Sequence, residues 1–251
     1  MTKLETFEEH FSRSPGFFSP FNVVLWDALL EWQHTMNVSG DLLEIGVYEG
    51  KSAGILALHA EKDESLYLVD PDEKLQQVCH KLATVCEGKV SPVQDRSDSA
   101  SVEELARLCG SGIRWIHIDG DHSAAGVTKD MELADRMLSN HGLVCVDDFF
   151  SPWYPQITLA VCRFLERNPG RLELVLCGFN KGYLGRPGSH TGELLRFLRD
   201  NLVFELEARG MRKVTLFKTD RPNPFNCFGI APLVPGKRRV GLDEDPDLLP
   251  I

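Results

Sequence analysis

Three aspartates and one histidine are the residues of this sequence best suited to chemistry. Asp119 and the pair Asp147-Asp148 each end a short apolar run, and His122 follows Asp119 by three residues. A set of carboxylate oxygens favours a hard cation such as Mg²⁺. A histidine with its ordinary pKa near ~6.5 can accept a proton at neutral pH. Together these residues predict a metal site with a general base beside it.

A second group of residues surrounds a glycine-rich turn, E-I-G-V-Y-E-G-K-S at 44–52. Its spacing is one residue too short for the triphosphate loop G-x-x-x-x-G-K-[ST]. A dinucleotide turn needs a glycine where Tyr48 stands, because a side chain there obstructs the approach of the pyrophosphate. The turn therefore favours a ligand without phosphates.

S-adenosylmethionine meets that requirement, because its charged end is an amino acid. Glu44 supplies an acid for the ammonium group, Gly46 and Gly50 keep the turn open, and the helix start around Ser52 offers N–H donors. Asp70 stands twenty residues after Gly50, where a carboxylate can accept both ribose hydroxyls. A plain strand–turn–helix would explain the glycines but not the acids on either side of them. The sequence thus predicts a site for this cofactor.

Apolar runs alternate with amphipathic ones from residue 41 to about 177, and this alternation must position the acids. The predicted strands are Leu42–Val47, Leu66–Asp70, Val90–Val93, Ile113–Asp119, Leu143–Asp147 and Leu172–Cys177. The predicted helices are Lys51–Ala60, Glu73–Val85, Ser101–Cys109, Ser123–Leu138 and Gln156–Arg167. The pattern is typical of a parallel sheet with helices on both faces. We predict an α/β fold with a doubly wound, mostly parallel, seven-stranded sheet, whose carboxyl edge gathers the acids.

The two ends of the chain give weaker signals. Residues 1–39 are predicted to form an N-terminal helical cap with a helix over Asn22–His34, and residues 40–220 the main domain. Residues 221–251, rich in proline, are predicted to be a C-terminal tail packed on the surface of the same domain. Past residue 177 the candidates are strands at Lys181–Gly185, Val203–Ala208 and Lys213–Lys218, with a helix at Thr191–Leu202.

Composition excludes several classes of partner. The 251 residues carry 27 Lys and Arg against 37 Asp and Glu, a formal net charge of −10, which argues against a nucleic-acid surface. No apolar run reaches the ~20 residues of a membrane helix, and the polar N-terminus does not resemble a secretory signal. The 7 cysteines, without a C-x-x-C pair, are typical of a reduced protein. We expect a cytoplasmic protein with a small-molecule partner, and a homo-oligomer stays open.

On these motifs the chain resembles the class I S-adenosylmethionine-dependent methyltransferases. The resemblance covers about 40–185 and rests on D-L-L-E-I-G-V-Y-E-G-K-S, Y-L-V-D-P and W-I-H-I-D-G-D-H. It implies the Rossmann-like fold of that family and a cofactor site that includes Asp119. It also implies that Q-D-R-S, which ends at Ser97, passes the adenine. The sequence departs from the family's commonest glycine motif at Tyr48.

The acids resemble those of a narrower family, the metal-dependent O-methyltransferases of macrolide sugars, such as the macrocin and mycinamicin enzymes. The resemblance implies that Asp119, Asp147 and Asp148 hold Mg²⁺ and that His122 takes the hydroxyl proton. The catechol-type enzymes have Asp-Asn where this chain has Asp147-Asp148, which favours the sugar type. The implied function is methyl transfer from S-adenosylmethionine to a hydroxyl of a small molecule, a sugar or a polyhydroxylated metabolite.

Three alternatives stay open. Cephalosporin-hydroxylase-like proteins share the fold pattern, and a non-catalytic S-adenosylmethionine-binding protein would carry the same cofactor motifs. H-I-D-G-D-H at 117–122 is also one substitution from H-x-H-x-D-H, a binuclear zinc hydrolase motif. That motif needs further histidines, of which only His141 and His190 follow in the sequence. A zinc site would also leave Glu44 and Asp70 without a role.

A cluster of aromatic residues follows the acidic pair directly. It comprises Phe149, Phe150, Trp153 and Tyr154. Aromatic rings commonly wall sites that bind organic rings and sugars. We expect these residues either to line the acceptor pocket or to pack an irregular loop.

Overall fold

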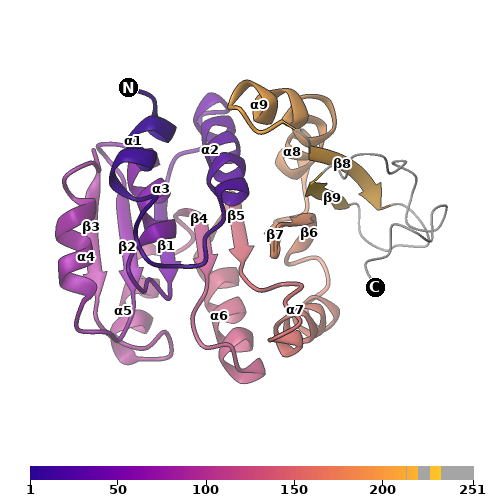
Figure 1. Cartoon of the computed structure of the whole chain (residues 1–251). Coiled ribbons are helices and arrows are strands. Elements are labelled where there is room, and N and C mark those ends of the chain that lie inside the picture. The colour runs from indigo at the N-terminus through magenta and orange to yellow at the C-terminus, as the bar shows by residue number, and fades with distance from the viewer. Residues whose placement is uncertain (213, 220–226, 233–251) are drawn as a thin grey trace.

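The computed structural model describes residues 1–212, 214–219 and 227–232. In that part of the chain, nine strands form one sheet in the order β3-β2-β1-β4-β5-β7-β6-β9-β8 (Figure 1). The strands are β1 (Asp41–Ile45), β2 (Ser65–Val69), β3 (Lys89–Val93), β4 (Ile113–Ile118), β5 (Leu138–Val146), β6 (Glu173–Gly178), β7 (Lys181–Gly185), β8 (Val214–Thr219) and β9 (Cys227–Pro232). The doubly wound α/β prediction is confirmed, with nine strands described where seven were predicted.

Strands β1 to β5 are parallel, because a helical crossover returns the chain to the same edge after each strand. Successive side chains of a strand point to opposite faces. Leu42 of β1 accordingly joins one hydrophobic cluster and Leu43 joins the other. Since both faces are apolar, both must be covered by helices.

Helices cover the two faces unequally. The face that holds Leu42 packs against α1 (Lys3–His10), α2 (Pro20–Thr35), α3 (Lys51–His59), α4 (Leu75–Leu82), α8 (Ser189–Asp200) and α9 (Leu202–Ala208). The hydrophobic cluster that holds Leu43 contains side chains of α5 (Ala100–Cys109), α6 (Ala124–Met137) and α7 (Pro155–Arg167). Figure 1 shows α2 above and α6 below the strands β4 and β5. This arrangement leaves the carboxyl edge of the sheet to loops.

The C-terminal part differs most from the sequence prediction. Leu202–Ala208 is helix α9 and not a strand: Leu202 and Leu206, four residues apart, are both fully buried on one side of a helix. Within the predicted tail, Cys227–Pro232 forms β9, which inserts between β6 and β8. The rest of that tail, residues 221–226 and 233–251, lies outside the described residues, as does Lys213 at the start of the predicted last strand.

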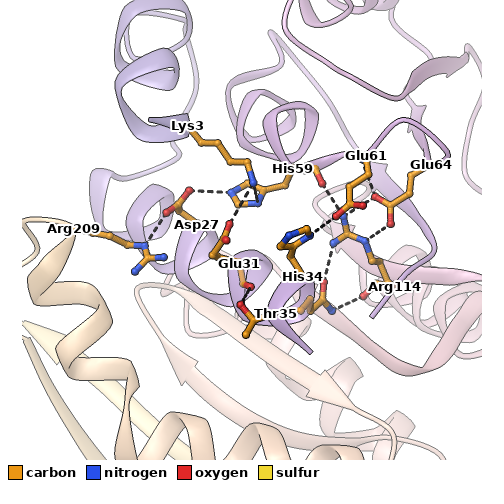
Figure 2. A network of polar contacts seen from close by, with 11 residues as sticks. Lys3, Asp27, Glu31, His34, Thr35, His59, Glu61, Glu64, Arg114 and Arg209 are labelled. Carbon is orange, nitrogen blue, oxygen red and sulfur yellow. Dashed lines mark hydrogen bonds and ion pairs between the residues drawn. The ribbon is translucent and has the colours of Figure 1, made fainter. Parts of the chain in front are cut away.

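A network of buried charges fastens the helices at the other edge of the sheet (Figure 2). Arg114 of β4 donates to both carboxylate oxygens of Glu64, each at 2.7 Å, and its side chain is only 4% exposed. Oδ1 of Asp27, on α2, lies 2.9 Å from Nε2 of His59, on α3. Its Oδ2 accepts a hydrogen bond of 2.7 Å from Nε of Arg209, which follows α9. These pairs join α2, α3 and α9, which are distant from one another in the sequence. They therefore stabilise the packing of the helices.

Candidate active site

The carboxyl ends of the neighbouring strands β2, β1, β4 and β5 form one level edge. The residue that follows β1, β4 or β5 donates its backbone N–H to the last carbonyl of the adjacent strand in the sheet, which is β2, β1 or β4 respectively. These bonds are Gly46 N to Val69 O (2.9 Å), Asp119 N to Ile45 O (2.8 Å) and Asp147 N to Ile118 O (2.9 Å). The edge therefore brings the predicted cofactor loop and the predicted metal ligands side by side.

The glycine loop between β1 and α3 requires its glycines. Gly46 has φ 82° and Gly50, the N-cap of α3, has φ 73°, values that favour glycine. A Cβ on Gly46 would overlap the carbonyl oxygen of Asp119, and one on Gly50 would overlap the side chain of Val78. Tyr48 adopts φ 50° as well and leaves its ring 59% exposed. The loop thus keeps its backbone open toward the edge of the sheet.

Asp70 holds that loop in place. Its Oδ2 accepts the N–H of Val47 at 2.7 Å and that of Tyr48 at 3.1 Å, and its Oδ1 accepts the N–H of Asp72 at 2.9 Å. A carboxylate oxygen has two acceptor sites, so these bonds leave room for further donors. Asp70 therefore shapes the loop and keeps acceptor capacity toward the cavity.

Glu44 lies behind the loop and is fully buried. Its Oε1 accepts the hydroxyl of Ser52 at 2.5 Å and lies 2.7 Å from Nδ1 of His117, on β4. Its Oε2 is buried without a partner among the described residues. A buried oxygen without a donor is costly, so a water molecule next to this oxygen would stabilise the carboxylate.

A cavity of about 1070 Å³ opens over this edge. Most of the predicted site residues line it: Gly46, Tyr48, Ser52, Asp70, Ser97, Asp119, His122, Asp147 and Asp148. Gly50 and Glu44 do not; the first is the N-cap of α3 and the second supports the loop from behind. One cavity thus serves both groups of residues that the sequence singled out.

His122 and Asp148 form the closest contact between a base and an acid in this cavity. Nε2 of His122 lies 3.0 Å from Oδ2 of Asp148 and 3.7 Å from Oδ1 of Asp119. The backbone carbonyl of His122 accepts the Gln156 amide at 2.8 Å, which fixes the loop that carries the imidazole. The side chain of His122 remains 34% exposed, so a ligand in the cavity can reach it.

The turn between β6 and β7 supports Asp148. Phe179 and Asn180 have φ 51° and 66°, as in a two-residue hairpin of type I′. Nδ2 of Asn180 donates to Oδ1 of Asp148 at 2.6 Å, and Asn180 O accepts the N–H of Phe149 at 3.0 Å. Asp148 itself has φ 53°, which is unusual for a residue other than glycine. The hairpin therefore holds a strained backbone with its carboxylate facing His122.

Asp147 points the other way, to a buried lysine. Nζ of Lys181 lies 2.5 Å from Oδ2 of Asp147, and the lysine side chain is 1% exposed. The same ammonium lies over the rings of Phe18, at 5.2 Å, and Trp26, at 5.7 Å. Nε2 of His117 lies 3.8 Å from the same Asp147 oxygen. Asp147 is therefore neutralised from inside the protein.

The charges shift the pKa values of these groups in opposite directions. Burial, aided by the charge of Asp147, raises the pKa of Asp119 to about 8. Burial also opposes ionisation of Asp147, but Lys181 and His117 outweigh it and lower the Asp147 pKa. For His117 burial favours the neutral form, yet Asp147 and Glu44 raise its pKa to about 9. The cations Lys181 and His117 thus compensate Asp147 more strongly than they compensate Asp119.

The structure groups the possible metal ligands differently from the predicted set. In the described part of the chain, Asp119, His122 and Asp148 have ligand atoms within 4.8 Å of one another, and so do His117, Asp119 and Asp147. All three residues of the first group line the cavity, whereas His117 of the second group does not, so the first group fits a divalent cation better. Asp147 remains a predicted ligand, although Lys181 already occupies one of its oxygens.

Sequence reasoning missed Asn180 and Lys181. The signal was present, because F-N-K-G separates two apolar runs and Asn favours the positive φ of a hairpin turn. Their role depends on register: β5 and β7 are antiparallel with Val146 opposite Gly182, which places Lys181 next to Asp147. Pairing between distant strands cannot be derived from either segment alone.

The predicted aromatic wall holds for two of its four residues. Trp153 and Tyr154 line the cavity, and the ring of Tyr154 lies 4.3 Å from that of His122. Phe149 is buried in the core, 2% exposed, and Phe150 packs edge-to-face against it outside the cavity lining. The loop therefore does both things that its sequence suggested.

The histidines that a binuclear zinc site would need lie elsewhere. His141 and His190 stack at 4.3 Å and line a separate cavity of about 340 Å³ with Arg171 and Arg186. They do not join His117 or His122 in either group of possible metal ligands in the described residues. The hydrolase alternative thus loses the ligands it requires.

Comparison with known families agrees with the geometry. Residues 43–149 match a family model described as a methyltransferase domain. Over these residues the chain is similar to a methyltransferase domain. The matched residues run from β1 to the end of the acidic pair and so include the glycine loop, Asp70, Asp119 and Asp148. The resemblance to class I methyltransferases is therefore confirmed.

Solved structures share the fold of this chain at low sequence identity. A TDP-rhamnose 3′-O-methyltransferase of calicheamicin biosynthesis is 16% identical, with a TM-score of 0.52, over 74% of this chain and 94% of that one. The O-methyltransferase NovP is 19% identical, with a TM-score of 0.52, over 67% and 80%. The MycE methyltransferase of the mycinamycin pathway, in complex with Mg and SAH, is 16% identical, with a TM-score of 0.52, over 73% and 54%.

One curated protein is similar to this chain in sequence. It is an uncharacterized protein of Acanthamoeba polyphaga mimivirus, 24% identical over 148 residues. The match covers 54% of this chain and 66%, just under two thirds, of the relative.

None of the helices in the described residues has the length and apolar character to span a membrane.

Proposed function

We propose that the protein transfers a methyl group from S-adenosylmethionine to a hydroxyl of a small molecule, a sugar or another polyhydroxylated metabolite. One observation carries the proposal: the His122–Asp148 contact of 3.0 Å faces the same cavity as the glycine loop and Asp70. A base and a phosphate-free cofactor cradle thus share one space. The names of the solved O-methyltransferases with this fold agree with such a reaction.

In the proposed cofactor site each residue has a separate task. Asp70 accepts the ribose hydroxyls while it holds the loop, and Ser97 lies beside the adenine. The open backbone between Gly46 and Gly50 receives the amino-acid end of the cofactor. The partnerless Oε2 of Glu44 receives the ammonium group, directly or through water.

In the proposed reaction His122 accepts the proton of the acceptor hydroxyl. The oxygen then forms its bond to the methyl carbon as the carbon–sulfur bond breaks, which releases S-adenosylhomocysteine. When Nε2–H of His122 donates to Asp148, Nδ1 keeps the lone pair that takes the proton, and Asp148 stabilises the imidazolium. Mg²⁺, if bound by Asp119 and Asp148 with Asp147 nearby, would lower the pKa of the hydroxyl.

Radiolabelled S-adenosylmethionine tests this proposal. The purified protein is incubated with a panel of sugars and polyols, with Mg²⁺ and with EDTA, and labelled products are identified by mass spectrometry. We expect label in an acceptor hydroxyl. Binding of the cofactor without transfer to any hydroxyl compound would favour the non-catalytic alternative, and transfer that EDTA does not reduce would remove the metal from the mechanism.

A further inference from the structure

A second cavity, of about 340 Å³, lies at the other end of β5 from the candidate active site. Asn140 and His141, near the start of that strand, line it, whereas Asp147 and Asp148, which follow the end of the strand, line the first cavity. The second cavity therefore has no part in the proposed methyl transfer. Its volume falls within the range of sites that bind small molecules.

The lining of this second cavity is basic, although the protein has a formal net charge of −10. Among the described residues the lining contains Arg171, Arg186, His141 and His190, and no Asp or Glu. Asp135 pairs with Arg171 at 2.9 Å and with Arg186 at 3.0 Å, but it does not line the cavity. Because one carboxylate faces two guanidinium groups, a positive charge remains beside the cavity.

The two arginines differ in what they can still bind. Arg186 is 18% exposed, and besides its pair with Asp135 it donates to the carbonyl of Leu138 at 2.9 Å. Arg171 is 56% exposed, and only its Nε and one terminal nitrogen contact Asp135. A guanidinium group has five N–H donors. The remaining donors of Arg171 have no partner among the residues that the structure describes, so they can bind a ligand.

His190 contributes a buried nitrogen to the same cavity. Its Nδ1 lies 3.3 Å from Oε2 of Glu193, and its Nε2 is buried without a hydrogen-bond partner in the described part of the chain. Burial and His141, whose ring stacks on it at 4.3 Å, outweigh Glu193 and lower the pKa of His190. When Nδ1–H donates to Glu193, the neutral ring therefore keeps a lone pair on Nε2, and this acceptor needs a proton donor.

The start of α8 adds backbone donors. Gly188, the N-cap of this helix, lines the cavity and provides no side-chain hydrogen bond to the first turn. The first N–H groups of a helix favour an anion. Donors thus approach the cavity from three directions: Arg171 before β6, the histidine pair, and the start of α8.

From this lining we infer that the second cavity is a binding site for a phosphate group. The anionic oxygens accept the free donors of Arg171 and the N–H groups at the start of α8. The second pKa of a phosphate group, about 6, is close to that of an imidazole, so the two can share one proton between a phosphate oxygen and Nε2 of His190. A carboxylate has only two oxygens in one plane and fits three directions of donors less well.

NMR of the imidazole C2–H signals tests the inference, because it reports which histidine a ligand approaches. The protein is titrated with sodium phosphate at constant pH and ionic strength, and the signals are assigned with the variants His141→Gln, His190→Gln and His122→Gln. We expect phosphate to shift the signals of His141 and His190 and to leave that of His122 in place. Glycerol 3-phosphate is titrated in parallel: tighter binding than phosphate identifies a phosphorylated metabolite as the source of the group, and weaker binding identifies free phosphate.

Replacement of Arg171 measures the contribution of its charge. Arg171→Gln should weaken phosphate binding about tenfold, because it removes a charge-assisted hydrogen bond. The variant keeps its fold, since the side chain is largely exposed and Arg186 still pairs with Asp135. Arg136→Gln is the matched control: Arg136 is 51% exposed and pairs with Glu103 at 2.6 Å, but it does not line the cavity. It should leave the affinity for phosphate unchanged.

Sulfate has the same shape as phosphate but no proton to share at neutral pH, so it should bind more weakly. The inference is wrong if millimolar phosphate shifts neither His141 nor His190, or if sulfate binds as tightly as phosphate. Equal affinity of Arg171→Gln and Arg136→Gln for phosphate would also overturn it. A shift of the His122 signal alone would place the anion in the other cavity and overturn it as well.

Discussion

Replacement of Lys181 by methionine tests whether the buried ion pair organises the acidic site. Lys181 is 1% exposed, and its Nζ is 2.5 Å from Oδ2 of Asp147. Methionine retains the length of the side chain between Phe18 and Trp26 but removes the charge. Asp147 would then be a buried carboxylate without its cation, which typically costs about 3–5 kcal/mol. For a chain of this size, about 2–4 °C per kcal/mol gives a fall in Tm of about 6–20 °C.

The loss should depend on pH in a defined direction. The folded pKa of Asp147 is lowered below its unfolded value, so this group stabilises the protein above about pH 4 and loses that effect as the pH falls through the folded pKa. Without Lys181 the carboxylate can be buried cheaply only when protonated. The difference between Lys181→Met and wild type should therefore be larger at pH 8 than at pH 5.

Urea unfolding at both pH values, with EDTA present to exclude metal binding, measures the effect. Lys129→Met is the matched control, because Lys129 is 57% exposed and its pair with Asp98 lies on the surface; it should cost at most about 1 kcal/mol. Adding Asp147→Asn to Lys181→Met should recover part of the lost stability. If Lys181→Met costs no more than the control, or if the two changes are simply additive, the ion pair does not organise the site.

Three further predictions concern the cofactor, the base and the scaffold. S-adenosylhomocysteine should raise the Tm of the wild type, and Asp70→Ala should abolish most of that shift, since it removes the ribose acceptor and frees the loop N–H groups; an unchanged shift would contradict the role of Asp70. His122→Ala should lower kcat by about 10²–10⁴ and leave cofactor affinity intact, whereas full activity from pH 6 to 9 would place the base elsewhere. Burial lowers the pKa of His59, despite its bond to Asp27, so the unfolded state binds the extra proton and the free energy of unfolding should fall as the pH drops below about 6.5. Chemical denaturation from pH 7.5 to 5 measures this slope, which His59→Gln should flatten, and an equal slope in that variant would assign it to other groups.

Local patterns in the sequence determined most of the first half of the sheet. The apolar runs of β2 and β4 end in an acid, so the residue pattern by itself assigns Asp70 and Asp119 to strand ends. The predicted first strand, Leu42–Val47, ran past Gly46, whereas β1 ends at Ile45. In a parallel sheet all such ends meet at one edge. The position of the candidate site and the identity of most of its residues follow from that rule. The glycines of the loop could also be predicted from the sequence, because a positive φ value depends on the residue itself and on its immediate neighbours.

Only the tertiary structure decided how the acids divide. Asp147 and Asp148 are neighbours in sequence, yet one faces Lys181 and the other faces His122. The division arises because β7 pairs antiparallel to β5, and this pairing joins segments more than thirty residues apart. Tertiary contacts also place β9 between β6 and β8. They likewise make Leu202–Ala208 a helix. Strand order and the burial of a short apolar segment depend on what packs against them, which no local pattern records.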